Sequence, residues 1–273
     1  MGIVNVTPDS FSDGGRHAEA GAAIAHGQHL HRSGADIVDV GGESTRPGAV
    51  RVSATEEARR VLPVISALSA AGVAVSVDTM RAEIAREAVA AGAILVNDVS
   101  GGVADPAMLS TVADLRVPLV MGHWWPDRRR GAGHAADPAA QSASAMGAAV
   151  VATDLQVGLT AAAAAGIDLT SVVLDPGIGF AKSADDNWTI LAHLPDLIAL
   201  GRPLLIGVSR KSFLGLLLGS PGAPRPVRER EDATTALSAL VAAEGAWGVR
   251  VHNVGPSVDA VTIVARLRAA GSP

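Results

Sequence analysis

Residues 73–98 read VAVSVDTMRAEIAREAVAAGAILVND, and this stretch indicates the fold class. It begins with an apolar, largely β-branched run at 73–77, continues through an Ala-rich amphipathic segment at 81–91, and returns to a second apolar run at 94–96. Gly92 follows the middle segment, and glycine commonly ends helices because it tolerates positive φ. The pattern predicts a strand, a helix and a second strand, which is the repeating unit of a parallel sheet.

The same alternation continues in both directions along the chain. Strands are predicted at 1–5, 37–40, 73–77, 94–96, 118–121, 172–174, 204–207 and 248–251. Helices are predicted at 20–33, 54–71, 81–91, 107–115, 142–165, 187–200, 232–244 and 257–270. Eight such units in one chain favour a closed (β/α)₈ barrel, the TIM barrel, over an open sheet. A single domain spanning residues 1–273 follows, because no linker interrupts the alternation.

Composition narrows the class of protein. Hydrophobic residues make up 48% of the chain and charged residues 18%, which is typical of a globular protein. The net charge of −5 offers no general attraction for nucleic acid or an anionic membrane, so neither partner is expected. No apolar run approaches the roughly 18–20 residues that span a bilayer. The chain has no cysteine and its start lacks the features of a signal peptide, so a cytoplasmic location is expected.

Polar residues follow the predicted strands at their C-terminal ends, where a TIM barrel carries its active site. Nearly every strand is apolar along its length and ends in a residue that can hydrogen-bond or titrate. These residues are Asn5, Asp39, Glu43, Asp78, Asn97, Asp98, His123, Asp175, Ser209, Arg210, Lys211, Arg250 and His252. One such residue only ends a strand, but a whole ring of them predicts a single site at the barrel mouth.

Seven motifs that contain most of these residues resemble the dihydropteroate synthase family, in the family's order and over almost the whole chain. They are NVTPDSFSDGG (5–15), DVGGESTRPG (39–48), SVDT (76–79), NDVSGG (97–102), LDPGIGF (174–180), SRKSF (209–213) and RVH (250–252). The resemblance implies condensation of 6-hydroxymethyl-7,8-dihydropterin diphosphate with p-aminobenzoate, giving 7,8-dihydropteroate and diphosphate in folate synthesis. It also implies Mg²⁺ as cofactor, a homodimer, and sulfonamides as competitive ligands.

The pterin pocket is predicted from hydrogen-bonding chemistry. A pterin presents N–H donors beside an oxo acceptor, which suits a buried carboxylate and an amide. Asp175 and Asn97 suit these roles, and the resemblance implies them with Asp78 nearby. The resemblance also implies pterin contacts from Phe180, Lys211 and Met121. The alternative is that the segments at 175–177 and 97–98 only form a turn and a helix cap, and the complete ring of polar residues disfavours it.

The diphosphate site is predicted from charge. Loss of diphosphate requires cations and well-aimed donors. Arg250 and His252 occupy alternate positions of the last predicted strand, so both can reach the mouth from one side. Asn5 resembles the family's ligand to a Mg²⁺ that bridges the diphosphate, and Mg²⁺ prefers oxygen ligands while keeping several waters. Without Arg250, His252 would be interpreted as a partly buried structural histidine.

The p-aminobenzoate site is predicted around the segment SRKSF at 209–213, which begins a helix whose amides attract an anion. The resemblance implies that Ser212 and these amides hold the carboxylate, while Lys211 borders the amine. The residues that it implies around the aromatic ring are Thr45, Arg46 and Pro47. The alternative, a surface helix start, is disfavoured because positive charge is unfavourable at that end.

The expected mechanism is substitution at the pterin's exocyclic methylene, with diphosphate leaving early. Arg250, with His252 and Mg²⁺, stabilises the leaving group, and Lys211 reaches the pterin ring. A carbocation spread into the pterin ring is stabilised by a nearby carboxylate, Asp13 or Asp78, and the neutral arylamine attacks it.

Two positions depart from the family pattern. Gly122 separates Met121 from His123, where the family usually has Met and His adjacent, and Asn253 stands where Asp is common. The chain also begins within its first predicted strand, so we expect the residues that precede this strand in the family to be missing or dispensable. Two alternatives stay open: a pterin-binding methyltransferase barrel that acts with a corrinoid partner, and a non-catalytic pterin-binding paralogue.

Overall fold

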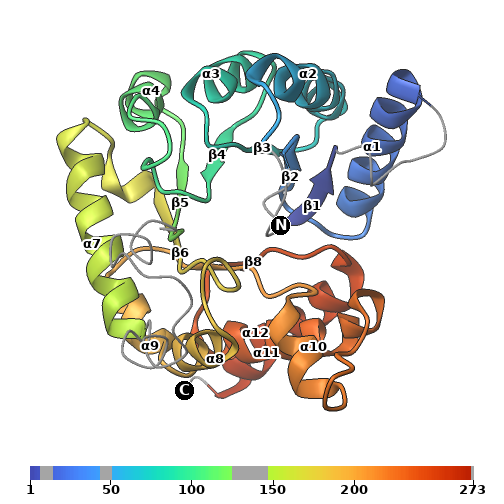
Figure 1. Cartoon of the computed structure of the whole chain (residues 1–273), viewed down its shortest axis with the longest axis vertical. Helices are drawn as coiled ribbons and strands as arrows, with labels where there is room; N and C mark the ends of the chain where they lie inside the picture. The colour runs from blue at the N-terminus through green and yellow to red at the C-terminus, as the bar shows by residue number, and fades with distance from the viewer. Residues whose placement is uncertain (7–14, 44–50, 125–146, 272–273) are drawn as a thin grey trace.

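The structure is a computed structural model, which describes residues 1–6, 15–43, 51–124 and 147–271, with only the backbone for 15–19. In this part of the chain, eight short strands lie at the centre and helices surround them (Figure 1). The strands are β1 (Gly2–Asn5), β2 (Val38–Gly41), β3 (Val75–Asp78), β4 (Leu95–Asp98), β5 (Leu119–Gly122), β6 (Val172–Asp175), β7 (Leu205–Ile206) and β8 (Gly248–Val249).

The helices alternate with the strands in chain order, and the last one follows β8. They are α1 (Gly15–Arg32), α2 (Ala54–Ala70), α3 (Ala82–Ala90), α4 (Met108–Leu115), α7 (Ala148–Ala164), α8 (Ala184–Ala192), α9 (Leu194–Ile198), α10 (Ser212–Leu218), α11 (Glu231–Glu244) and α12 (Val254–Gly271). Two short 3₁₀ helices, Leu169–Ser171 and Val227–Arg230, precede β6 and α11. No helix of the described residues is long and apolar enough to cross a membrane.

The strands close into a barrel. β1 to β6 form one parallel sheet in chain order, and β7 pairs with β8 in a second. Parallel bridges join the two sheets at both junctions, Leu174 with Leu204 and Gly2 with Val251. The amide of Ile3 donates to the carbonyl of Val251 at 3.0 Å, which connects the last strand to the first. The predicted TIM barrel is therefore confirmed.

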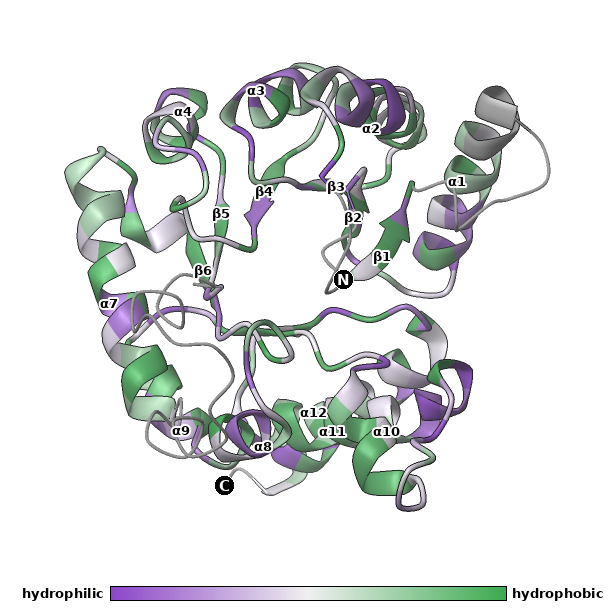
Figure 2. Cartoon of the chain, viewed as in Figure 1, coloured by the Kyte–Doolittle hydropathy of each residue, from purple (hydrophilic) through white to green (hydrophobic). Residues whose placement is uncertain are grey.

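Both faces of the strands are buried, which explains the apolar strand sequences. Outward-facing residues such as Val96 and Leu174 pack against the helices in the main core. Inside the barrel a smaller cluster forms from Leu95, Val120, Val173 and Leu205, with Met1 packed against it. The ribbon coloured by hydropathy shows hydrophobic strands with hydrophilic residues at the ends of β1 and β4 (Figure 2). Polar residues therefore gather above the inner apolar cluster.

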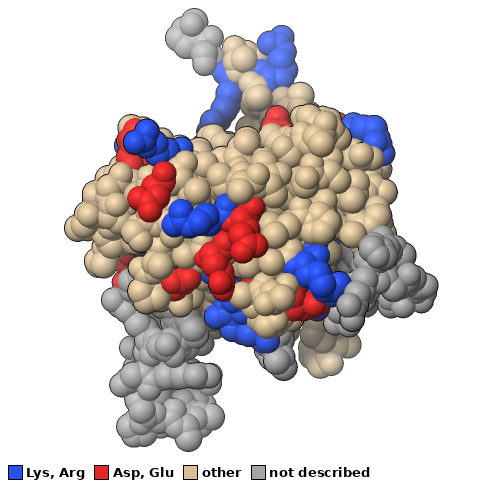
Figure 3. All heavy atoms as spheres, turned by 90° about the horizontal axis from the view of Figure 1, so that it is seen from above, with Lys and Arg blue, Asp and Glu red and all other residues tan. Residues whose placement is uncertain are grey.

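The helix predictions are confirmed with one correction, except that residues 142–146 of the helix predicted at 142–165 lie outside the described residues. The single helix predicted at 187–200 is two helices, α8 and α9, because Pro195 lies in the first turn of α9 and cannot donate a backbone hydrogen bond to α8. The glycines that end the predicted helices adopt positive φ: Gly34, Gly72, Gly92, Gly166, Gly201 and Gly245. On the face seen in Figure 3, the coloured basic side chains lie near acidic ones, without a large patch of one sign.

Candidate active site at the barrel mouth

Four polar side chains from different parts of the barrel meet inside its mouth. Arg250, directly after β8, donates from Nε to Asp39 Oδ2 at 2.6 Å and from Nη2 to Asp78 Oδ2 at 2.7 Å. Asn97 on β4 donates from Nδ2 to the same Asp39 oxygen at 2.9 Å. We call Asp39, Asp78, Asn97 and Arg250 the mouth cluster. Its members are separated by up to 211 residues in sequence, so the closed barrel alone brings them together.

Asp39 is the centre of this cluster. Its carboxylate is fully buried, and one oxygen accepts from both Arg250 and Asn97. The other oxygen, Oδ1, has no hydrogen-bond partner among the described residues. The sequence places Asp39 in the polar ring but assigns it no role, because its partners are distant in the chain. Its contacts indicate that it orients an arginine and an amide at the same time.

The electrostatics of the mouth cluster are strongly perturbed. Burial raises the pKa of Asp78 to about 7 against the opposing effect of Arg250, and the neighbouring Asp39 raises it further. Burial alone would lower the pKa of Arg250, but Asp39 and Asp78 raise it above its ordinary value. Arg250 therefore stays charged, while Asp78 changes its protonation state near neutral pH. Such perturbed groups in a concave mouth are typical of functional sites.

Lys211 and Asp175 form a second group beside this cluster. Lys211 precedes α10, and its Nζ lies 3.8 Å from the centre of the Phe180 ring, a cation–π contact. Burial lowers the pKa of Lys211 to about 8, with Asp175 acting in the opposite direction. A side chain on Gly179 would lie 2.7 Å from Lys211 Cδ, so a glycine is required for this packing. The ammonium thus lies over a ring face and is stabilised electrostatically by Asp175.

Asp175 was predicted either to bind the pterin or only to form a turn, and its contacts are compatible with both roles. Its Oδ1 accepts from the amide of Gly177 at 2.7 Å, so it does order the turn that follows β6. Burial raises the pKa of the same carboxyl, opposed by the Gly177 amide and by Lys211. Asp175 therefore shapes the turn and still presents a partly buried carboxylate near Lys211.

Asn97 and Asp98 face opposite sides of β4, as adjacent strand residues do. Asn97 joins the mouth cluster. Asp98 instead accepts from the amides of Ser100 and Gly102, at 2.8 and 2.7 Å, and from the Ser100 hydroxyl at 2.7 Å. Asp98 therefore orders the turn after β4 and caps no helix, since α4 begins only at Met108, whereas Asn97 belongs to the mouth cluster.

His252 and Asn5 lie at the rim. The Ser209 hydroxyl is 2.9 Å from Nδ1 of His252 and accepts from its amide at 3.2 Å, which fixes the ring. Asn5 ends β1, and its partner in register is Gly41 on β2. A side chain on Gly41 would contact Asp78 at 3.4 Å, so β1 and β2 run close beside the mouth cluster. Ser209 is a positioning residue whose role the sequence did not reveal.

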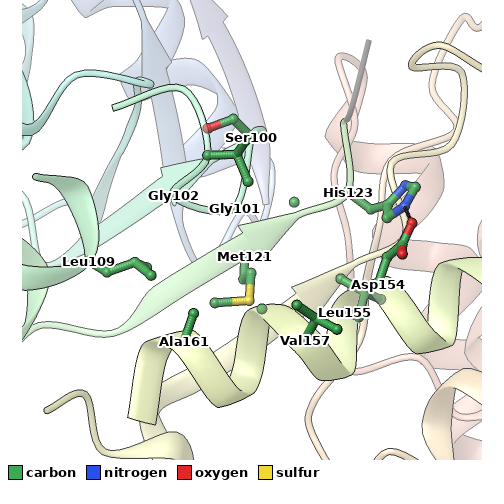
Figure 4. A pocket seen from close by; sticks show the side chains of 13 residues that line it. Ser100, Gly101, Gly102, Leu109, Met121, His123, Asp154, Leu155, Val157 and Ala161 are labelled. Atoms are coloured by element: carbon green, nitrogen blue, oxygen red, sulfur yellow. Dashed lines mark hydrogen bonds and ion pairs between the residues drawn. The ribbon is translucent and has the colours of Figure 1, made fainter. Parts of the chain in front are cut away.

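Met121 lies elsewhere, and this corrects the prediction of a pterin contact. Its side chain faces outward, where it lines a cavity of about 140 Å³ between β5, α4 and α7 (Figure 4). Its sulfur approaches Gly158 of α7. The side chain of Asn97, which is paired in register with Val120, lies on the opposite face of the sheet. Side chains alternate along a strand, so Val120 is the β5 residue that faces the barrel interior. Met121 is therefore a core residue.

His123 also faces away from the mouth cluster. It is buried, with Nε2 3.0 Å from Asp154 Oδ2 on α7 and Nδ1 3.1 Å from Lys182 Nζ. Lys182 in turn donates to the carbonyl of Gly177 at 2.9 Å. This chain of contacts supports the turn that carries Asp175 and Phe180. The sequence analysis did not identify Lys182 or Asp154, because both are distant from His123 in the chain and no local pattern links them to it.

Gly122 is the last residue of β5, paired in register with Asp175. A side chain there would lie 2.4 Å from the carbonyl oxygen of Val99, so the backbones of β4 and β5 approach too closely for any other residue. The departure from the family pattern at this position is accordingly a packing feature. Asn253, the second departure, is exposed just before α12.

Gly122→Ala should destabilise the fold by about 1–3 kcal/mol, the usual range for overpacking, because backbone atoms cannot move aside as a flexible side chain does. Chemical denaturation of the variant and the parent protein checks this. Gly158→Ala is a suitable comparison, since its added methyl group would meet the flexible Met121 side chain and should cost less. Equal stability of Gly122→Ala and the parent would contradict the packing assigned to β5.

The remaining predicted site residues lie outside the described residues. They are Asp13, Thr45, Arg46 and Pro47. Ser212, the first residue of α10, is described and is exposed. Of the predicted residues that are described, the structure joins Arg250 directly to Asp78 and, through Asp39, to Asn97. Asp175 and Lys211 interact electrostatically with this cluster, and Phe180 contacts Lys211.

Comparison with known proteins extends over nearly the whole chain. Residues 1–252 match the model of a family described as pterin binding enzyme. The chain is 50% identical over 268 residues to "Dihydropteroate synthase" of Mycobacterium leprae (strain TN), covering 97% of this chain and 91% of that protein.

Solved structures agree. A dihydropteroate synthase of Xanthomonas albilineans with 4-aminobenzoic acid superimposes with a TM-score of 0.88 at 46% identity, covering 100% of this chain and 93% of that one. A structure of that organism's enzyme with 7,8-dihydropteroate gives a TM-score of 0.84 at 43% identity, covering 100% and 94%. The Yersinia pestis enzyme in a sulfonamide drug complex gives 0.83 at 38% identity, covering 98% and 94%.

Proposed function

Because the chain belongs to the dihydropteroate synthase family of pterin-binding enzymes, we propose that it condenses 6-hydroxymethyl-7,8-dihydropterin diphosphate with p-aminobenzoate. The products are 7,8-dihydropteroate and diphosphate, as in folate synthesis. The observation that carries the proposal is the mouth cluster, in which two carboxylates, an amide and a guanidinium are held together at the barrel mouth.

The pterin is bound by Asp175, Asn97 and Asp78. Asp175 and Asp78 supply carboxylate acceptors for ring N–H groups, and Asn97 supplies both a donor and an acceptor. The carboxylates are partly buried, so water weakens their hydrogen bonds with a ligand less than at an exposed site. Phe180 and Lys211 cover the heterocycle, a role supported by their contact of 3.8 Å.

The diphosphate is bound by Arg250 and His252. Arg250 already shares its guanidinium between two carboxylates, and its remaining donors are available to phosphate oxygens. Mg²⁺ is the proposed cofactor, and Asn5 is its proposed protein ligand. Among the described residues no cluster of three acidic or histidine side chains could hold a metal alone. Mg²⁺ prefers oxygen ligands, and the Asn5 amide oxygen would be the ligand that the protein supplies.

p-Aminobenzoate is bound by Ser212, at the start of α10, with Thr45, Arg46 and Pro47 around its ring. Lys211 is adjacent to Ser212 in the chain and lies against Phe180, so one short segment links the two proposed substrate sites. Sulfonamides resemble p-aminobenzoate in shape and charge, and we propose them as competitive ligands here. The sulfonamide complex of the Y. pestis enzyme supports this assignment.

The reaction breaks the bond between the pterin methylene carbon and the diphosphate oxygen. Both bonding electrons leave with diphosphate, whose charge Arg250 and His252 offset. Mg²⁺, when bound, would add Lewis-acid stabilisation of the leaving group. Positive charge left on the methylene spreads into the pterin and is stabilised by Asp78 or Asp13. The arylamine nitrogen then forms the new C–N bond and loses a proton to water.

The value of kcat/KM for the pterin diphosphate should be largest between about pH 7 and 8. Asp78 is ionised above its pKa of about 7, and Lys211 is charged below its pKa of about 8, so the active form is lost on either side. A pH–rate profile checks this expectation. Lys211→Arg should extend the profile to higher pH, because arginine stays charged. An unchanged alkaline limb in that variant would contradict the assignment to Lys211.

The direct test mixes the purified protein with the pterin diphosphate, p-aminobenzoate and Mg²⁺, and measures diphosphate release. Release that requires p-aminobenzoate, with dihydropteroate formed in equal amount, is expected. Pterin binding without release would indicate the non-catalytic paralogue. Methyl transfer from a reduced folate to a corrinoid protein would indicate the methyltransferase.

We also propose a homodimer, and a cytoplasmic location for which the lack of cysteine gives support. Large apolar side chains are exposed on α11 and α12, which pack against each other. They are Leu240, Ile263 and Leu267. Large apolar side chains exposed on two helices that pack together support an interface between copies at this face. Sedimentation velocity checks the assembly: a single species at the monomer mass of 27.5 kDa would contradict it.

A further inference from the structure

The chain contains twenty arginines and two lysines, Lys182 and Lys211, and both lysines contact the same residue. Lys211 Nζ lies 3.8 Å from the centre of the Phe180 ring. Lys182 Nζ donates to the carbonyl oxygen of Phe180 at 3.2 Å. An ammonium is a compact charge whose three donors point in different directions, whereas a guanidinium is a flat fork. A position that requires several differently directed donors therefore favours lysine in this arginine-rich chain.

The ammonium of Lys182 lies inside the turn that follows β6. Besides its bond to Phe180, it donates to the carbonyl of Gly177 at 2.9 Å and to that of His123 at 3.1 Å. The carbonyl of Gly177 also accepts from the amide of Phe180 at 3.0 Å, and the amide of Gly177 donates to Asp175 Oδ1 at 2.7 Å. The peptide groups on both sides of Gly177 are thereby fixed, one by Asp175 and the other by Lys182.

The backbone of this turn adopts a conformation that needs support from outside. Gly177 and Ala181 have φ of 67° and 50°, although Ala181 carries a side chain. A residue with a side chain is seldom left-handed unless the surrounding structure enforces it. The bond between Lys182 Nζ and the carbonyl of Phe180 closes the chain around Ala181. A side chain on Gly177 would overlap the carbonyl oxygen of His123 and lie 3.1 Å from Lys182 Nζ, so the turn is packed closely around the ammonium.

A histidine and an aspartate hold the ammonium in place. Lys182 Nζ lies 3.1 Å from Nδ1 of His123. Nε2 of the same ring is 3.0 Å from Asp154 Oδ2 on α7 (Figure 4). An ammonium can only donate, so Nδ1 accepts from Lys182, and Nε2 carries the hydrogen that is donated to Asp154. The side chains of His123 and Asp154 are 2% and 1% exposed, so this chain of contacts connects Lys182 to the buried interior between β5 and α7.

We propose that Lys182 is a positioning residue for the pterin, acting through Asp175 and Phe180. The proposal rests on the proposed function, in which these two residues contact the heterocycle. Without the ammonium, the carbonyls of Gly177 and Phe180 lose their shared donor, and the Asp175 carboxylate and the Phe180 ring are no longer held in one arrangement. Affinity for the pterin then falls, whereas Ser212 at the start of α10 keeps its place for p-aminobenzoate. Misplacement of about 1 Å by a distant residue can cost two orders of magnitude in rate.

The test uses Lys182→Ala, which removes the ammonium and leaves space for a small amine. We expect the calorimetric Kd for the pterin diphosphate to rise about ten- to hundredfold, with KM for p-aminobenzoate unchanged at saturating pterin diphosphate. Propylammonium in the buffer should restore most of the lost affinity, because it replaces the atoms that were removed together with their charge. Propanol, which has a similar size and no charge, should not. Lys182→Arg should resemble Lys182→Ala, because a planar fork cannot reach the same carbonyls.

Ser183→Ala is the matched control. Ser183 caps α8 and accepts from the amide of Asp186 at 3.1 Å, so its loss weakens the next helix without touching the carbonyls that Lys182 holds. This variant should keep the parental affinity for the pterin diphosphate. An equal loss in Ser183→Ala, an equal loss for both substrates in Lys182→Ala, or no recovery with propylammonium would overturn the role of Lys182.

Fluorine NMR of protein labelled with 4-fluorophenylalanine separates failure of this inference from failure of the proposed function. The chain has three phenylalanines, of which Phe213 is buried in the core and serves as a reference. The Phe180 signal, assigned with Phe180→Leu, should move in Lys182→Ala and return with propylammonium. An unchanged Phe180 signal would overturn the inference. If the parent protein released no diphosphate, the proposed function would fail, yet the Phe180 signal would still show whether Lys182 fixes the turn.

Discussion

Arg250→Ala is expected to lower kcat/KM for the pterin diphosphate by about 10²–10³-fold, the usual effect of removing a preorganised donor from a developing anion. Arg250 is already oriented by Asp39 and Asp78, at 2.6 and 2.7 Å, before any substrate arrives. It therefore needs little reorganisation when charge develops on the departing diphosphate. Steady-state kinetics with varied pterin diphosphate gives the measurement.

Loss of stability must be separated from loss of catalysis in this variant. Removing Arg250 leaves Asp39 fully buried without its cation, which typically costs about 3–5 kcal/mol. The double variant Asp39→Asn/Arg250→Ala removes that unpaired charge and should recover stability without recovering activity. Arg250→Lys keeps a point charge but loses the planar fork, so an intermediate rate is expected. Full activity of the stable double variant would remove Arg250 from the mechanism.

The barrel could be predicted from the sequence because its signal is local and repeated. Each apolar run followed by an amphipathic stretch and a glycine, as at 73–92, specifies one strand and one helix. The helix predicted at 187–200 is divided in two, and Pro195 is the one residue in the sequence that indicates the break. The closure of the ring depended on pairing between Gly2 and Val251, which no local pattern encodes.

Site residues on strands could be predicted where the sequence shows which side chains of the strand face the barrel interior. Asp78 and Asn97 were placed correctly because both are polar residues at strand ends that face the barrel interior. Met121 was misplaced because a shift of one residue along β5 moves a side chain to the other face. The central role of Asp39 could not be predicted from the sequence, because its partners are 58 and 211 residues away in the chain.

Lys211→Ala is expected to reduce kcat/KM by about 10²–10³-fold, because it removes a positioned charge beside Asp175 and above Phe180. The variant also removes the methylenes that pack against Gly179, so packing and charge are lost together. Lys211→Met separates them, since it keeps an unbranched apolar chain of similar length without the charge.

If the charge is what matters, Lys211→Met should be as slow as Lys211→Ala although its fold is closer to that of the parent. Calorimetry with the pterin alone shows whether the loss falls on binding or on the chemical step. Phe180→Leu tests the partner: it removes the ring face that holds the ammonium and should weaken pterin binding less than either lysine change. A Lys211→Met variant with parental kcat/KM would mean that the Lys211 side chain serves the packing of the turn after β6 and that its charge does not serve the reaction.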